Sequence, residues 1–173
     1  LRELGGPMSM ADLEAVEPVW EEPIAAAYRD LLVHVPPPPA ESFQFPLALR
    51  ILDGFDLSSL EHLGVEHLDR VLRAIRLSAE ARILNNNRSP DEIREVLGEA
   101  SVAALRARVL DGEPITARTE QFGPPPPAAI AEARSHTTSV SIADREGNMI
   151  CLTQSLGSPW GSTVVIPGTG VCM

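Results

Sequence analysis

Apolar residues between positions 65 and 84 recur at steps of three and four, which is the spacing of an α-helix with one buried face. The residues on this stripe are Val65, Leu68, Leu72, Ile75 and Ala79. We therefore predict a helix from about Val65 to Leu84 that buries these five side chains.

Shorter patterns predict elements before this helix. A short helix is expected to begin near Ser9 or Asp12. The stretch "IAAAYRDLLVHV" predicts two extended segments on either side of Arg29-Asp30. The stretch "FPLALRILDG" predicts a second helix that Gly54 ends.

A further helix is predicted after residue 88. Ser89 suits a cap, Pro90 suits the first helical position and Glu92 stands three residues after the cap. We expect this helix to run without a break to about Leu110 and to end at Gly112.

Residues 137–155 change to the pattern of a β-hairpin. The segments "TTSVSIAD" and "MICLTQS" flank "REGN", so a loop of residues 145–147 places Asp144 opposite Asn148. The facing residues are then Thr137 and Ser155, Ser139 and Thr153, and Ser141 and Cys151, on one hydroxyl-bearing face. The opposite face is apolar and carries Val140, Ile142, Ile150 and Leu152. We expect a sheet buried on both faces, with Cys151 as a small buried side chain.

Composition and charge exclude several classes of partner. The chain has 14 basic and 24 acidic residues, a net charge of −10, which disfavours nucleic acid and anionic membrane surfaces. No apolar run is long enough to span a bilayer. The proline runs at 36–39 and 124–127 are stiff connectors or, alternatively, polyproline recognition segments. Residues 112–136 lack a sustained apolar period, and we expect a flexible linker there.

We expect neither a metal nor a cofactor. The histidines His34, His62, His67 and His136 lack the spacing of metal ligands, and two cysteines form no metal site or disulfide framework. The sequence starts without methionine and stops after an apolar run, so we expect a piece cut from a longer protein at both ends.

The adjacent pair Thr137-Thr138 follows the expected linker and begins the expected strand. A threonine hydroxyl becomes a nucleophile when a base stands beside it, and the α-amino group of an N-terminal threonine can be that base. Cleavage between His136 and Thr137 would create this terminus. The alternative is that two threonines stand here only because threonine favours strands.

The stretch "TTSVSIADREGNMICLTQSLGSPWGS" resembles the start of the small subunit in the γ-glutamyltranspeptidase (glutathione hydrolase) family. The upstream stretch "MADLEAVEPVWEEPIAAAYRDLLVHVPPPP" is similar to the large subunit of the same family. The resemblance implies an α+β fold, part of an N-terminal-nucleophile αββα sandwich. Residues 1–136 would be the C-terminal part of the large-subunit region, helical with a Pro-rich flexible end. Residues 137–173 would be the β-rich N-terminal part of the small-subunit region, starting at the nucleophile.

The resemblance also implies roles for individual residues. Thr137 would be the nucleophile and, after cleavage behind His136, its α-amine the base. Ser155 would hydrogen-bond and orient Thr137. Gly157, which stands where the family has asparagine, and Thr138 would lie against the substrate. Ser139 replaces a family histidine.

The implied reaction is that of a γ-glutamyltransferase or glutathione hydrolase, an amidohydrolase that forms an acyl-enzyme. The substrate would be a γ-glutamyl compound such as glutathione, and the acceptor would be water, an amino acid or a peptide. Two alternatives stay open: a related acylase of different acyl specificity, and a non-catalytic homologue that is never processed. Further site residues would lie outside residues 1–173, so residues 1–173 alone are expected to be inactive. Members of the family are usually periplasmic or extracellular.

Overall fold

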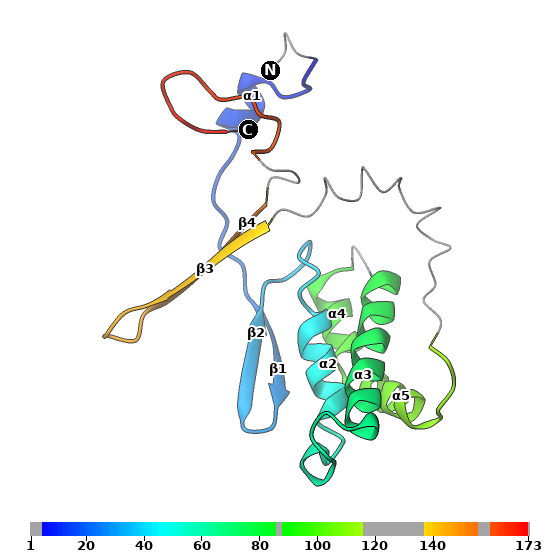
Figure 1. The fold of residues 1–173 in the computed structure, drawn as a ribbon. Coiled ribbons are helices and arrows are strands. Elements are labelled where there is room, and N and C mark those ends of the chain that lie inside the picture. The colour runs from blue at the N-terminus through cyan, green and yellow to red at the C-terminus, as the bar shows by residue number, and fades with distance from the viewer. Residues whose placement is uncertain (1–4, 86–87, 116–136, 156–159, 173) are drawn as a thin grey trace. The chain divides into compact units, whose positions relative to one another are not determined.

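The computed structural model describes residues 5–85, 88–115, 137–155 and 160–172. The chain divides into two compact units, Leu1–Arg118 and Thr119–Met173. Helices and small antiparallel sheets make this an α+β protein, as predicted (Figure 1). The predicted linker of residues 112–136 falls largely outside the described residues.

The first unit contains one two-stranded sheet and several helices. In chain order these are α1 (Met10–Glu14), β1 (Ile24–Tyr28), β2 (Leu31–Val35), α2 (Gln44–Leu52), the 3-10 turn η2 (Leu57–Ser59), α3 (Val65–Leu84), α4 (Pro90–Val96) and α5 (Glu99–Leu110).

Helices α1 and α4 begin at serines that the sequence offers as caps. The Ser9 hydroxyl accepts from the Asp12 amide, and the Ser89 hydroxyl accepts from the Glu92 amide, each in a reciprocal capping box. Strands β1 and β2 join through Arg29-Asp30, with Arg29 at φ 53°. The short helix, the first hairpin and the helix at residues 44–52 are therefore confirmed.

The core of the first unit lies where α2 packs against α3, α5 and β1. Its fully buried side chains include Leu47 and Ile51 from α2, Leu77 from α3 and Val102 from α5. They form one aliphatic cluster with Ile24 of β1, as expected for a chain with only 4% aromatic residues. Burial of such side chains is the main stabilising term for this unit.

The bounds predicted for α3 are confirmed, but the predicted buried face is wrong. Val65 is 88% exposed and Leu72 55%, while Ala74, Leu77 and Ser78 are fully buried. The helix carries a second stripe of apolar and small residues, and this is the stripe that is buried. Periodicity identifies a stripe that can be buried, but it does not say which stripe the neighbouring helices cover.

The single helix predicted from Ser89 to about Leu110 is also wrong, because it is interrupted. Helix α4 ends at Val96 and α5 begins at Glu99. Gly98 lies between them with an extended backbone, φ −68° and ψ 158°, and its amide bonds the Glu95 carbonyl at 2.9 Å. The break lets Ile93 and Val102 both reach the core.

Two arginines tie distant segments of the first unit together. The Arg73 guanidinium donates to Asp69 and to the carbonyls of Gly112 and Glu113 at 2.9 and 2.8 Å. Arg106 donates to the Arg50 carbonyl at 2.7 Å and packs where a side chain on Gly54 would collide with it. Gly54 therefore leaves room for Arg106; its backbone is not left-handed, unlike that of Gly112 at φ 74°.

The second unit contains the predicted hairpin. Strands β3 (Thr137–Ala143) and β4 (Met149–Ser155) pair antiparallel with Thr137 opposite Ser155, as the sequence predicts. The Asp144 amide donates to the Asn148 carbonyl at 3.0 Å, and Gly147 has φ 86°. This is a three-residue loop closed by a glycine bulge, and it fixes the register. Beyond it, Val165 and Cys172 form an isolated bridge.

The expectation that both faces of this hairpin are buried is not met in the described residues. Every residue of β3 and β4 is exposed, including Val140 and Ile142 of the apolar face. Cys151 is likewise exposed and is not a buried small side chain. The described part of the second unit contains no helix or further sheet layer that packs on either face.

Across the described residues, none of the helices combines the length and the apolar character that a membrane span requires.

The capping box of α4 gives a pH-dependent prediction. Hydrogen bonds from the Ser89 amide, the Arg88 guanidinium and the Ser89 hydroxyl lower the pKa of Glu92 from 4.5 to about 2. Because the folded-state pKa is depressed, this stabilisation is complete above pH 4.5 and is lost as the pH falls through about 2. Glu92→Gln should remove that pH dependence, measured by urea unfolding between about pH 5 and pH 2. Glu95→Gln, outside the capping box, is the control; an equal effect there would contradict the assignment.

Candidate active site

The candidate site begins at the open end of the β3–β4 hairpin. Thr137 is the first residue of β3 and Ser155 the last of β4, so strand pairing alone brings them together. The Thr137 hydroxyl donates to the Ser155 hydroxyl with an Oγ1–Oγ distance of 3.2 Å. The structure therefore unites the two residues that the sequence places in the nucleophile and orienting positions.

Two more pairs of small polar side chains continue this face toward the turn. Ser139 faces Thr153, and Ser141 faces Cys151, whose Sγ lies 3.4 Å from Ser141 Oγ. Side chains alternate between the two faces of a strand, so all six groups lie on the Thr137 side of the hairpin. The face predicted to bear hydroxyls is present.

The other predicted site residues are not brought to this pair. Thr138 faces Gln154, and its side chain lies on the apolar side of the hairpin, opposite to Thr137. Any contact between Thr138 and a substrate at the Thr137 hydroxyl would therefore run through its backbone. His136 and Gly157 lie outside the described residues.

The backbone conformation of the segment that follows the hairpin was not predicted from the sequence. Trp160 adopts φ 62° and Gly161 φ 58°, and the Thr163 amide closes a turn onto the Trp160 carbonyl at 2.9 Å. A left-handed tryptophan is sterically unfavourable, and the sequence pattern "SPWGS" signals only a turn. Asp144, at the far end of the hairpin, has its pKa lowered by hydrogen bonds from the Asn148 side chain and amide. Its ionised carboxylate holds the turn.

The described histidines do not assemble a metal site. His62 and His67 meet edge to face with ring centroids 5.5 Å apart. Among the residues that the structure describes, no group of three or more His, Cys, Asp or Glu side chains could hold a metal ion.

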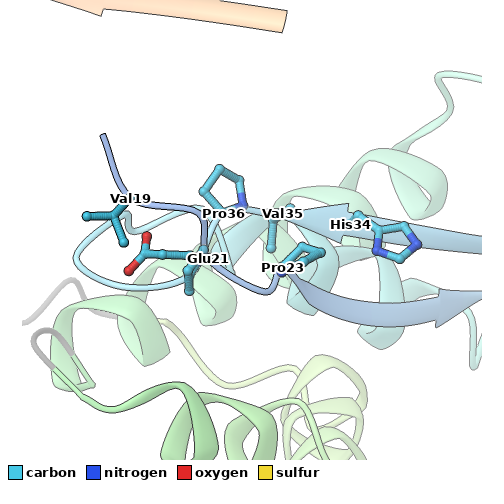
Figure 2. Close-up of a pocket in the computed structure, with 7 residues that line it drawn as sticks. Val19, Glu21, Pro23, His34, Val35 and Pro36 are labelled. Carbon is cyan, nitrogen blue, oxygen red and sulfur yellow. The ribbon is translucent and has the colours of Figure 1, made fainter. Parts of the chain in front are cut away.

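The first unit has a hollow of about 390 Å³ that was not predicted from the sequence. Figure 2 shows Glu21 and His34 at opposite ends of it, with Pro23 and Val35 between them. The wall is otherwise made of Val19, Pro36 and Pro37. Glu21 and His34 are thus not arranged as an acid–base pair.

Known proteins match the chain over its whole length. The sequence model of the gamma-glutamyltranspeptidase family covers residues 1–173. A glutathione hydrolase-like proenzyme of Bacillus subtilis, YwrD, is 27% identical over all of this chain and 31% of its own length. Acylase ACY 1 proenzyme of Pseudomonas sp. (strain SE83) is 31% identical over 96% of this chain and 29% of its own. Human glutathione hydrolase 7 is 26% identical over 94% of this chain and 24% of its own.

With a match over every residue, the chain belongs to the gamma-glutamyltranspeptidase family. It spans about a third of the length of the first curated relatives that it matches.

The register of the candidate site can be tested with a disulfide. In Ser141→Cys the new thiol should form a cross-strand disulfide with Cys151, because the present Oγ–Sγ distance is 3.4 Å and facing residues of a hairpin have suitably close Cβ atoms. Under oxidising conditions the intact mass should fall by two hydrogens, and the thiol of Cys151 should no longer be free. Val140→Cys, on the other face, should stay reduced. Cross-linking at 140 and not at 141 would show that the register is shifted by one residue.

Proposed function

We propose that Thr137 is the nucleophile of a self-cleaving amidohydrolase, of which residues 1–173 form part of an N-terminal-nucleophile αββα sandwich. The observation that carries the proposal is the hydroxyl contact between Thr137 and Ser155 at the first pair of the hairpin. Family membership supports it, since the related proteins are named as proenzymes. The αββα layers would also cover the hairpin faces that are exposed among the described residues.

The proposed maturation uses only groups of the chain and water. Thr137 Oγ1 attacks the carbonyl carbon of His136, and the peptide C–N bond breaks as an ester forms. The hydroxyl proton ends on the released nitrogen, which becomes the α-amine of Thr137. Water then hydrolyses the ester, leaving the His136 carboxylate and a free Thr137 hydroxyl. Residues 1–136 and 137–173 would thereby belong to separate subunits.

The freed amine would then serve as the base for catalysis. It takes the proton of the Thr137 hydroxyl while Oγ1 attacks a substrate amide, and returns a proton to the leaving amine. The acyl group, now an ester of Thr137, passes to water, an amino acid or a peptide. Ser155 orients the nucleophile and can donate to its oxygen as negative charge develops there.

We propose a γ-glutamyl compound such as glutathione as the substrate, in line with the relatives that are named glutathione hydrolases. A second candidate is an acylase of different specificity. It is favoured by the 31% identity to an acylase proenzyme and by Gly157, which offers no side chain where the family has asparagine. Residues from outside 1–173 are expected to complete the substrate site in either case.

Replacing the nucleophile tests the mechanism. In the complete protein, Thr137→Ala should leave one uncut chain and lower turnover about a thousandfold or more, because no other group can form the acyl-enzyme. Thr137→Ser keeps a hydroxyl and should still be cut. Intact mass reports the cut directly.

Ser141→Ala is the matched control, because it removes a hydroxyl from the same face two pairs away. It should be cut like the wild type. Cleavage of Thr137→Ala at the same bond would show that the nucleophile lies elsewhere.

A substitution at position 157 tests the proposed substrate specificity. Gly157→Asn should raise kcat/KM for a γ-glutamyl anilide about tenfold, the value of one or two added hydrogen bonds to the glutamyl group. The wild type should also accept plain acyl anilides. Gly157→Ala controls for the loss of glycine itself. A wild type that rejects plain acyl amides strictly and is fast on the γ-glutamyl substrate would contradict altered specificity at Gly157.

A further inference from the structure

The hydrogen-bonding phase of the β3–β4 hairpin is fixed at its turn. The Asp144 amide donates to the Asn148 carbonyl, so this is a hydrogen-bonded pair. In an antiparallel ladder such pairs alternate with pairs whose amides and carbonyls point away from the partner strand. Counting back along the register, Thr138–Gln154 is the last hydrogen-bonded pair, and Thr137–Ser155 is of the other kind.

This phase explains why the two hydroxyls meet. Facing Cα atoms lie about 4.5 Å apart in a pair without backbone hydrogen bonds and about 5.5 Å apart in a pair that has them. Short side chains touch more readily across the closer pair. The contacts at Thr137–Ser155 (3.2 Å) and Ser141–Cys151 (3.4 Å) both fall on such pairs.

We infer that this phase has a second effect, which is to keep the backbone nitrogen of Thr137 out of the ladder with β4. The Thr138–Gln154 backbone pair is then the clamp that holds the nucleophile. The inference rests on the proposed function. After cleavage Thr137 has no preceding residue, so the clamp one residue away is the nearest pair of backbone hydrogen bonds. Gln154 is therefore a positioning residue that acts through its backbone, with its side chain on the face away from the hydroxyls.

The alternative phase would hinder the chemistry. If the hairpin were displaced by one residue, the nitrogen of Thr137 would donate to a carbonyl of β4. A carbonyl acceptor stabilises the protonated amine, which cannot act as a base. The Thr137 hydroxyl would also lose Ser155 as its facing residue and would share its face with Leu152 and Gln154 of β4.

Backbone esters in the complete protein test the clamp. Replacing Gln154 by its α-hydroxy analogue removes the amide that donates to the Thr138 carbonyl. The same change at Thr153 is the control, because the Thr153 amide points away from β3 and only the more distant Val140–Leu152 pair is weakened. We expect the ester at 154 to slow both the cut and kcat about tenfold, with KM unchanged, and the ester at 153 to change either rate less than about twofold. Equal effects of the two esters, or a change confined to KM or thermal stability, would overturn the clamp.

Hydrogen exchange tests the position of the nitrogen without requiring a cut. In uncut Thr137→Ala, the amide of residue 138 should be protected and that of residue 137 should exchange fast. A protected amide at 137 would overturn the inference while leaving the nucleophile assignment intact. An uncut wild type would remove the proposed function and this inference with it.

Discussion

The candidate site depends on one constraint, the two-residue period of a β-strand counted from a fixed turn. Asp144, Gly147 and Asn148 set the closing pair, and every facing pair beyond it follows. A displacement of one residue between the strands would set the hydroxyl-bearing side chains of β3 opposite apolar residues of β4 such as Leu152 and Ile150, and the hydroxyl face would be lost. The contact between Thr137 and Ser155 therefore reflects a turn seven residues away as much as the two side chains themselves.

Features of the structure that depend on local interactions could be predicted from the sequence. The hairpin register, the cap at Ser89 and the bounds of α3 each depend on residues close together in sequence, and each was predicted correctly. For the first helix the sequence left Ser9 and Asp12 open as the start. The buried face of α3 was not predicted, because α2 and α5 decide which stripe they cover. The break at Gly98 was missed for a related reason: it brings Ile93 and Val102 into one core, which no local pattern reveals.

The site residues also differ in how far their positions could be predicted from the sequence. The sequence could pair Thr137 with Ser155 because both lie on one hairpin. The same register already places the Thr138 side chain on the opposite face. Its assignment to the substrate site came from the family resemblance alone, which does not say which face a residue occupies. The left-handed backbone of Trp160 also escaped prediction, because residues other than glycine rarely adopt this conformation.

The contacts of Arg73 limit which other residues could take its place. Its guanidinium spreads across a carboxylate and two backbone carbonyls that lie some forty positions further along the chain. A lysine there would keep the charge but offers a single nitrogen, which cannot span these acceptors in one plane. Among related sequences, exchange of arginine for lysine at position 73 should therefore be rarer than at Arg70, whose guanidinium pairs with Glu66 one turn away and lies over the Phe55 ring, contacts that a lysine can also make.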